Sequence, residues 1–416
     1  MREKRARATA ILAMLVIIGV AEWSPFTSAA GVPVIYVANA GNPSTITAVN
    51  GVTDSVERSI PIHHGVAIDV GVAPNGKHAY ALVVGNETVG LPGLLIPIST
   101  ATNAVGKAIS VGVDPQTVVF NPNGRFAYVI DGFNAATTAL NAPGTVTPVD
   151  LVNRVAGPPI KVGTNPSGMA ITPNGDTAYV TNSNAMNGHP TTITVINLVT
   201  DRPEKTIDVA ADTIAVTLNG EVAFALGPDA VIPIAVATNR AERPIDLGGV
   251  PQAIALAPDG QIAWVLATPD LRFGSKSTSV TLTAIDTGTY RIGKVIRLAG
   301  MPQTGQFFVA ITANGAHIFV LGQGSGKRAS ILAEIAASND VAGSPMRLGP
   351  DATALAVSPN SAFAYVLNPG DDYQGPPITP HPPNSPGTII PISTATGKLG
   401  KLIRVGLLAT AMAITK

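Results

Sequence analysis

Hydrophobic and polar residues alternate along most of the chain after residue 33. The alternating runs are short, as in residues 192–196 and 279–283, and turn-forming residues separate them. A period of two places every second side chain on one face of an extended strand. The pattern therefore predicts many short β-strands and no long helices.

One element recurs along the sequence: an apolar run, a turn resembling Pro-Asn-Gly, and an apolar run with an aromatic residue. The turns occupy residues 74–76, 122–124, 173–175, 218–220, 258–260, 313–315 and 359–361. Asn-Gly and Asp-Gly favour the positive φ angles of a type I′ turn, so each copy predicts a tight β-hairpin.

An aromatic residue occupies one fixed place in each repeat. These residues are Tyr36, Tyr80, Tyr128, Tyr179, Phe224, Trp264, Phe319 and Tyr365. A large ring at this place can fill the gap between neighbouring sheets. Two further runs follow, and the last has an apolar-x-apolar form in residues 109–111, 207–209, 245–247 and 296–298. Each repeat therefore predicts four strands.

The two ends of the chain complement each other. Residues 410–414 resemble the first strand of a repeat, whereas residues 34–39 resemble a second strand with no first strand before it. Pairing them would close a ring and protect its sheet edges. We predict an all-β fold, a single β-propeller domain over residues 31–416 with eight four-stranded antiparallel blades. Seven blades is the alternative, if the copy near residues 211–213 forms no full sheet.

The N-terminus has the pattern of an export signal. Basic residues at positions 2–7 precede an uncharged run (residues 8–21), and Ser28-Ala29-Ala30 offers small residues for cleavage before Gly31. We expect residues 1–30 to be a signal peptide and the protein to be secreted or associated with the cell envelope. The alternative is a retained anchor, although Glu22 ends the run short of the ~20 residues that a span needs.

Composition excludes several classes of protein. The chain of 416 residues has no cysteine, which excludes disulfides, thiolate metal sites and a cysteine nucleophile. Its formal net charge is zero, so no overall field attracts nucleic acid, and we expect no nucleic-acid partner.

Residues 173–182 (Pro-Asn-Gly-Asp-Thr-Ala-Tyr-Val-Thr-Asn) resemble the signature of the YVTN-type β-propeller repeat proteins, and residues 36–39, 128–131 and 365–368 are similar to it. The resemblance implies an exported or surface-layer-associated propeller. This chain departs from the family's pattern at Val83, Gly227, Ala267 and Gly322, where the motif has Asn. It also departs in its predicted count of eight blades, because family members usually have seven.

The second-to-third strand loops are long and share one rim with the links between repeats. They include residues 132–144, 183–190, 269–276 and 369–387. Propeller blades act as scaffold and function usually lies in loops around the central channel, so we expect a site on this rim.

Histidine and aspartate residues on this rim are the candidates for chemistry. The catalytic candidates are His63, His64, Asp131 and His189; the metal-ligand candidates are His381, Asp371 and Asp372. Converging His and Asp side chains can bind a divalent metal or supply a general base. No catalytic motif accompanies them, and solvated loop residues are the competing interpretation. We therefore predict no cofactor, with a divalent metal as the alternative.

Other polar positions favour structural interpretations. Asn39, Asp131, Asn182 and Asn368 follow the aromatic residue at one offset, which predicts side chains that accept backbone N–H bonds at strand ends. His78 and His317 lie beside the hairpin turns and are predicted to be surface residues.

These observations favour a binding module over an enzyme. We expect the long-loop rim to present a surface to an envelope protein or a cell-wall component. The alternative is a hydrolase or lyase: some similar propellers are lactonases or lyases that use a central metal or a histidine base.

Overall fold

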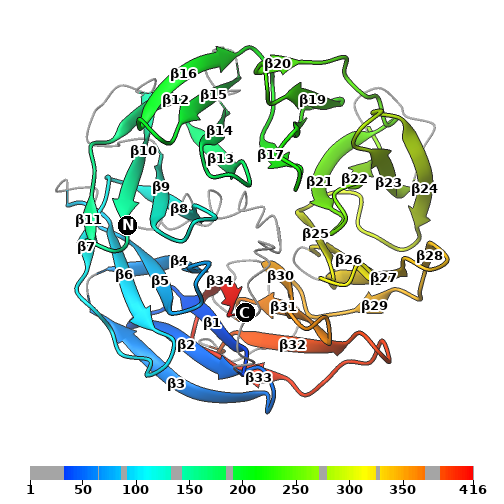
Figure 1. The fold of residues 1–416 in the computed structure, drawn as a ribbon. Coiled ribbons are helices and arrows are strands. Elements are labelled where there is room, and N and C mark those ends of the chain that lie inside the picture. Colours follow the sequence, from blue (N-terminus) through cyan, green and yellow to red (C-terminus); the bar gives the residue numbers. More distant parts are fainter. Residues whose placement is uncertain are drawn as a thin grey trace.

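The computed structural model describes residues 32–63, 65–85, 91–132, 143–183, 191–270, 279–324, 328–370 and 385–415. This part of the chain forms 34 β-strands and no helix, grouped into eight antiparallel sheets around a common axis. Figure 1 views the ring along that axis, with the sheets arranged as the blades of a propeller. The prediction of eight blades is confirmed.

Within the described residues, no helix is long and apolar enough to span a bilayer.

The strands of blades 1 to 4 follow the order predicted from the repeat, from the inside of the ring outward. Blade 1 contains β34 (Ala409–Ile414), β1 (Val34–Asn39), β2 (Ser44–Asn50) and β3 (Ser55–Ile62). Blade 2 contains β4 (Val66–Val72), β5 (His78–Val84), β6 (Leu94–Ser99) and β7 (Ile109–Ser110). Blade 3 contains β8 (Pro115–Phe120), β9 (Phe126–Asp131), β10 (Pro143–Asp150), β11 (Val155–Ala156) and β12 (Ile160–Thr164). Blade 4 contains β13 (Pro166–Ile171), β14 (Thr177–Asn182), β15 (Thr192–Asn197) and β16 (Arg202–Ile207).

Blades 5 to 8 complete the ring in the same order. Blade 5 contains β17 (Thr213–Val216), β18 (Val222–Leu226), β19 (Val231–Ala235) and β20 (Arg240–Ala241). Blade 6 contains β21 (Val250–Leu256), β22 (Ile262–Thr268), β23 (Val280–Asp286) and β24 (Ile292–Leu298). Blade 7 contains β25 (Phe307–Ile311), β26 (His317–Gly322), β27 (Ile331–Ala336), β28 (Val341–Ala342) and β29 (Met346–Arg347). Blade 8 contains β30 (Ala354–Val357), β31 (Phe363–Asn368), β32 (Thr388–Ser393) and β33 (Ile403–Arg404).

The copy near residues 211–213 forms a complete blade, but its outer strand differs from the prediction. Residues 245–247 form no strand, and Ile245 makes only a single bridge to Val231. The outer strand of blade 5 is instead β20, two residues long.

The hydrophobic core lies between the blades. Eight clusters of buried side chains are present in the described part of the chain, and each one joins two neighbouring blades. A blade therefore buries its two faces only against its neighbours, which is the reason a repeat of this kind needs a closed ring.

Strand β34 closes the ring as predicted. It pairs antiparallel with β1, with Tyr36 opposite Ala413 and Ala38 opposite Ala411. The Val34 amide donates to Thr415 Oγ1 at 2.8 Å. Blade 1 is thus built from both ends of the chain, and Figure 1 shows the last strand lying beside the first.

In seven of the eight blades the aromatic residue of the second strand pairs with Gly or Ala on the first strand, and in blade 3 it pairs with Val119. These partners are Ala413, Gly71, Val119, Ala170, Ala215, Ala255, Ala310 and Ala356. All eight aromatic side chains are buried. Small partners leave room for the ring, which explains why the sequence repeats an aromatic at this place.

Several aromatic side chains also contact the third-to-fourth turn of the following blade. Tyr36 Oη donates to Asn103 at 2.7 Å and Tyr179 Oη donates to Asn239 at 2.5 Å. Phe224 meets Tyr290 edge-on, with ring centroids 6.2 Å apart. These contacts join neighbouring blades on one rim of the ring.

The predicted type I′ turns are wrong. In the first hairpin, Gly76 has φ +68°, whereas Asn75 has no positive φ angle. The Gly76 amide donates to the Ala73 carbonyl, and Ala73 N donates to His78 O. This is a type I turn followed by a left-handed glycine, which suits Pro74 at its second position.

Candidate functional site: the loop rim

The two rims of the ring differ in how their strands are joined. On the rim we call the hairpin rim, each of the seven first-to-second connections has five residues, as in 73–77 and 358–362. On the opposite rim, the loop rim, the second-to-third connections range from four residues (40–43) to nineteen (369–387). The loop rim therefore offers the variable surface that a specific ligand needs.

The innermost strands carry β-bulges where they reach the loop rim. In blades 1, 2, 3, 4 and 6 the pairing of the first and second strands shifts by one residue at this place. The extra residues are Thr410, Ile68, Gln116, Ser167 and Gln252. Bulges re-aim side chains and are frequent beside functional sites. Hydrophobic alternation alone did not reveal them.

Uncharged polar groups dominate this set of bulges. Gln116 Nε2 donates to the Asp114 carbonyl at 3.2 Å, and Gln252 Nε2 donates to Thr268 Oγ1 at 3.3 Å. Both glutamines are half-buried, and each lies on a blade with an eleven-residue loop (132–142 and 269–279). Such amide groups can donate and accept hydrogen bonds without fixing a charge on the ligand.

Asp131 lies at the base of the loop 132–142 and is almost fully buried. Its Oδ2 accepts hydrogen bonds from Thr147 Oγ1 at 2.5 Å and from Thr145 Oγ1 at 3.2 Å. Its Oδ1 has no hydrogen-bond partner among the described residues. Burial raises the pKa of this carboxyl to about 7, against the lowering effect of the two threonine bonds.

Other repeats carry asparagine where blade 3 has Asp131. The Asn39 amide donates to Thr47 Oγ1 at 3.0 Å, and the Asn182 amide donates to Thr194 Oγ1 at 3.0 Å. Each amide also donates to strand carbonyls, including Val37 O. The predicted capping is therefore wrong in direction: the two amides donate to the third strand and do not accept backbone N–H bonds. Asp131 occupies a structural position of the repeat.

A second buried carboxyl, Asp69, was not predicted. It lies on the innermost strand of blade 2 and accepts hydrogen bonds from Thr117 Oγ1 at 2.8 Å and Val118 N at 3.1 Å, both on blade 3. Burial raises its pKa, and these bonds oppose the rise. A single Asp within an apolar run gave no sign of this inter-blade contact.

The predicted chemical candidates are not brought together by the described residues. His63 is exposed in the link between β3 and β4, whereas Asp131 is buried on blade 3, and no contact joins them. The remaining candidates lie outside the described residues: His64, His189, Asp371, Asp372 and His381. In the part of the chain that is described, no group of three or more His, Asp or Glu residues could hold a metal ion.

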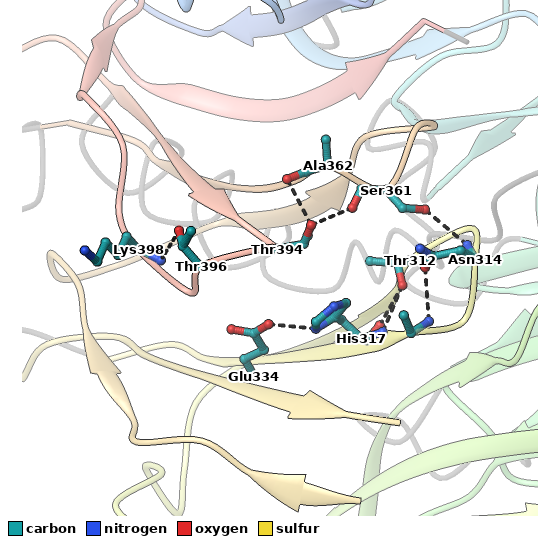
Figure 2. A network of polar contacts seen from close by, with 10 residues as sticks. Thr312, Asn314, His317, Glu334, Ser361, Ala362, Thr394, Thr396 and Lys398 are labelled. Carbon is teal, nitrogen blue, oxygen red and sulfur yellow. Dashed lines mark hydrogen bonds and ion pairs between the residues drawn. The ribbon is translucent and has the colours of Figure 1, made fainter. Parts of the chain in front are cut away.

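The hairpin rim contains a contact between a histidine and a carboxylate that the sequence pattern did not predict. His317 Nδ1 lies 2.8 Å from Glu334 Oε1 (Figure 2). Both side chains are half-buried, so His317 lies beside its hairpin turn as predicted but is only partly exposed. Glu334 stands opposite Phe319 on the neighbouring strand. His78 is also half-buried.

This His317–Glu334 contact lies where blades 7 and 8 meet. The carboxylate faces Gly397 of blade 8: a Cβ atom there would lie 3.2 Å from Glu334 Oε2. Ser361 Oγ accepts a hydrogen bond from Asn314 N, which joins the two hairpins directly (Figure 2). The pair therefore serves blade packing on the rim opposite the long loops.

Comparisons with known proteins support the fold. No protein-family model and no curated protein matches the sequence. Among solved structures, the chain is similar to the dihydro-heme d1 dehydrogenase NirN in complex with DHE, with a TM-score of 0.66, 13% identity, and coverage of 97% of this chain and 80% of that one. It is also similar to Kuenenia stuttgartiensis hydrazine synthase, with a TM-score of 0.54, 18% identity, and coverage of 74% and 95%.

A third similar structure is a functionally unknown protein from Desulfotomaculum acetoxidans, with a TM-score of 0.53, 12% identity, and coverage of 92% of this chain and 98% of that one. At these identities the likeness concerns architecture alone. The chain is therefore an eight-bladed β-propeller whose loop rim is its candidate functional surface.

Proposed function

We propose that the protein is an exported binding module that presents its loop rim to a component of the cell envelope, either an envelope protein or a cell-wall polymer. The observation that carries this proposal is the contrast between the rims: five-residue hairpins throughout one, and connections of four to nineteen residues on the other. Uniform connections serve the scaffold, whereas varied ones build a specific surface.

The bulged polar residues support the same proposal. Gln116, Ser167, Gln252 and Thr410 place neutral hydrogen-bonding groups at the inner end of the loop rim. Neutral donors and acceptors suit peptide amides and sugar hydroxyls, which are the groups that envelope proteins and cell-wall polymers expose.

Replacing two long loops tests this proposal. Residues 132–142 and 269–279 are each replaced by the four-residue connection of blade 5 (227–230). We expect the variant to keep its melting temperature within a few degrees and to lose retention on isolated envelope and cell-wall fractions. A matched control carries Lys77→Ala and Arg125→Ala on the hairpin rim and should bind like the wild type. Equal binding by all three proteins would contradict the proposal.

Catalysis is the alternative function, and a separate experiment decides it. The mature protein is assayed for metal content and for hydrolysis of a panel of esters and lactones. The binding proposal expects no stoichiometric metal and no turnover. Turnover that is lost in His63→Ala, with the fold retained, would establish the hydrolase alternative instead.

We also propose that the protein is secreted after cleavage before Gly31 and that it is a YVTN-type repeat protein. The basic and apolar segments of residues 2–21 support export, and the Tyr-Val-x-Asn runs ending at Asn39, Asn182 and Asn368 support the family. N-terminal sequencing of the exported protein should begin at Gly31. A protein retained with residues 1–30 intact would support an anchor.

A further inference from the structure

Charge is distributed unevenly around the outer edge of the ring. The outer segments of blades 6, 7 and 8 are residues 291–298, 341–348 and 398–405. They contain seven basic residues and no acidic one: Arg291, Lys294, Arg297, Arg347, Lys398, Lys401 and Arg404. The chain as a whole is neutral, so this edge departs from the overall balance.

The outer segments of blades 1 to 5 have a different composition. Over residues 55–62, 104–111, 155–164, 202–209 and 240–247, seven basic residues are accompanied by five acidic ones. The acidic residues are Glu57, Glu204, Asp208, Glu242 and Asp246. The positive charge of blades 6 to 8 is therefore a local feature and not a property of every outer strand.

Two of the seven cations have acidic neighbours. Lys294 Nζ lies 3.0 Å from Asp340 Oδ2. Arg291 lies near Asp286: hydrogen bonds from Thr289 contribute most to the lowered pKa of Asp286, and the charge of Arg291 lowers it further. The other five are exposed and form no ion pair with a described residue: Arg297, Arg347, Lys398, Lys401 and Arg404.

Exposed apolar side chains lie among these cations. Leu402 is 57% exposed and Leu399 48% in blade 8, Val341 is 59% exposed in blade 7, and Ile292 and Val295 are 45% and 50% exposed in blade 6. Branched apolar side chains next to exposed Lys and Arg form a surface with two kinds of attraction: charge for an anion and apolar area for hydrocarbon.

We propose that this basic-apolar edge, residues 291–298, 341–348 and 398–405, docks on a bilayer that contains anionic lipids. Arginine and lysine side chains pair with lipid phosphates, while Leu399, Leu402 and Val295 enter the headgroup region. A soluble polyanion would use the cations but leave the apolar side chains in water, and so it explains only half of the surface. Figure 1 shows β24, β28, β29 and β33 following one another along the outside of the ring, where a membrane can reach them.

Co-sedimentation with vesicles tests the proposal. Residues 31–416, which contain every described strand, are mixed with vesicles of phosphatidylglycerol and phosphatidylcholine, or of phosphatidylcholine alone; residues 1–30 are omitted because their apolar run would bind lipid itself. We expect binding to the anionic vesicles only, and a strong decrease between about 0.05 M and 0.5 M salt because screening shortens the reach of the charges.

Two variants of the edge separate charge from apolar contact. Arg297→Glu, Lys401→Glu and Arg404→Glu together should weaken binding by tenfold or more, because each cation near an anionic surface contributes roughly fivefold. Leu399→Ser with Leu402→Ser should weaken binding severalfold. The control carries the same number of charge reversals on the other side of the ring: Lys107→Glu, Lys161→Glu and Arg202→Glu. It should keep most of the binding.

Three outcomes would overturn the proposal. They are binding that is equal for neutral and anionic vesicles, a control variant that loses as much as the edge variant, or apolar variants that bind like the wild type while inorganic polyphosphate competes. The last would identify a soluble polyanion as the ligand. This surface is separate from the loop rim, so the loop replacement described above should leave vesicle binding intact.

Discussion

The two rims of the ring are built by the same repeat but constrained differently. On the hairpin rim, five of the six turn glycines in the described residues pack near the hairpin of the preceding blade: Gly220 faces Pro173, and Gly315 faces Pro258. On the loop rim, connection length changes from blade to blade, and the described residues show bulges in some blades only. The contrast teaches that the repeat fixes the contacts between neighbouring blades on the hairpin rim and leaves the connections of the loop rim free to vary.

Replacing Asp131 is the change on the loop rim with the largest expected effect, because a carboxyl stands there where three other repeats have asparagine. Burial raises the pKa of Asp131 to about 7 in the folded state, whereas the carboxyl has its ordinary pKa of 3.8 in the unfolded chain. The unfolded chain therefore releases this proton at a lower pH than the folded protein does. The contribution of Asp131 to the stability of the folded state is therefore largest below about pH 4, falls as the pH rises toward 7, and is level above that.

Asp131→Asn, which introduces the residue found at Asn39, Asn182 and Asn368, should remove this decline. The upper bound on the gain at pH 8 is about 4 kcal/mol, since one pKa unit corresponds to ~1.4 kcal/mol. Urea unfolding at pH 4 and pH 8 measures it. A smaller decline should remain, because the pKa of Asp69 is also raised. A variant less stable than the wild type at pH 8 would show that the carboxylate itself is needed.

A glycine substitution tests the hairpin rim. Gly175 has φ +79°, and a Cβ atom there would clash with Asn121 Oδ1. Asn121 Nδ2 donates a hydrogen bond to Gly175 O at 2.8 Å. Gly175→Ala should cost about 3 kcal/mol, from backbone strain and a disturbed hydrogen bond. Gly76→Ala is the control: its φ is +68° but nothing lies within 4 Å, so about 1 kcal/mol is expected. Equal losses of stability by the two variants in thermal unfolding would refute a role for the contact between neighbouring hairpins.

The tyrosine contacts between blades should have a smaller effect. Tyr179→Phe removes the 2.5 Å bond to Asn239 and should cost about 1 kcal/mol. Tyr365→Phe removes a longer bond, 3.3 Å to Gly51 O, and should cost less. Blade 5 already carries Phe224 at this place, so both variants should fold. The order of the two denaturant midpoints is the check, and a reversed order would contradict it.

The exposed pair Lys294–Asp340 should have the smallest effect. The side chains are 50% and 30% exposed, and screened pairs of this kind contribute about 0.5 kcal/mol or less. Lys294→Ala should therefore shift the unfolding midpoint only slightly, and the shift should vanish at about 1 M salt. A large shift that persists in salt would indicate packing by the lysine stem.

Sequence periodicity predicted the scaffold well because the repeat itself encodes it. The aromatic position, its spacing and the incomplete ends led to eight blades and to the pairing of residues 410–414 with β1. The turn type was wrong because Asn75 and Gly76 do not both need positive φ when Pro74 starts a type I turn.

The candidate site was harder to predict for a physical reason. The bulges at Gln116 and Gln252 arise from pairing between strands, which alternation of single residues does not report. The direction of the Asn39 and Asn182 hydrogen bonds depends on threonines six to twelve residues away. The residues of the loops do not recur with the repeat, so the repeat could not predict which side chains lie near His63.

A disulfide across the closing strands measures the ring most directly. Ala38 and Ala411 are opposite each other in β1 and β34, and the chain has no other cysteine to compete. Ala38→Cys with Ala411→Cys should form one intramolecular disulfide on mild oxidation, seen as a shift in non-reducing electrophoresis, while Ala38→Cys with Ala255→Cys should form none. Failure of the first pair to cross-link in the folded monomer, or cross-linking by the second, would contradict a ring closed by both ends of the chain.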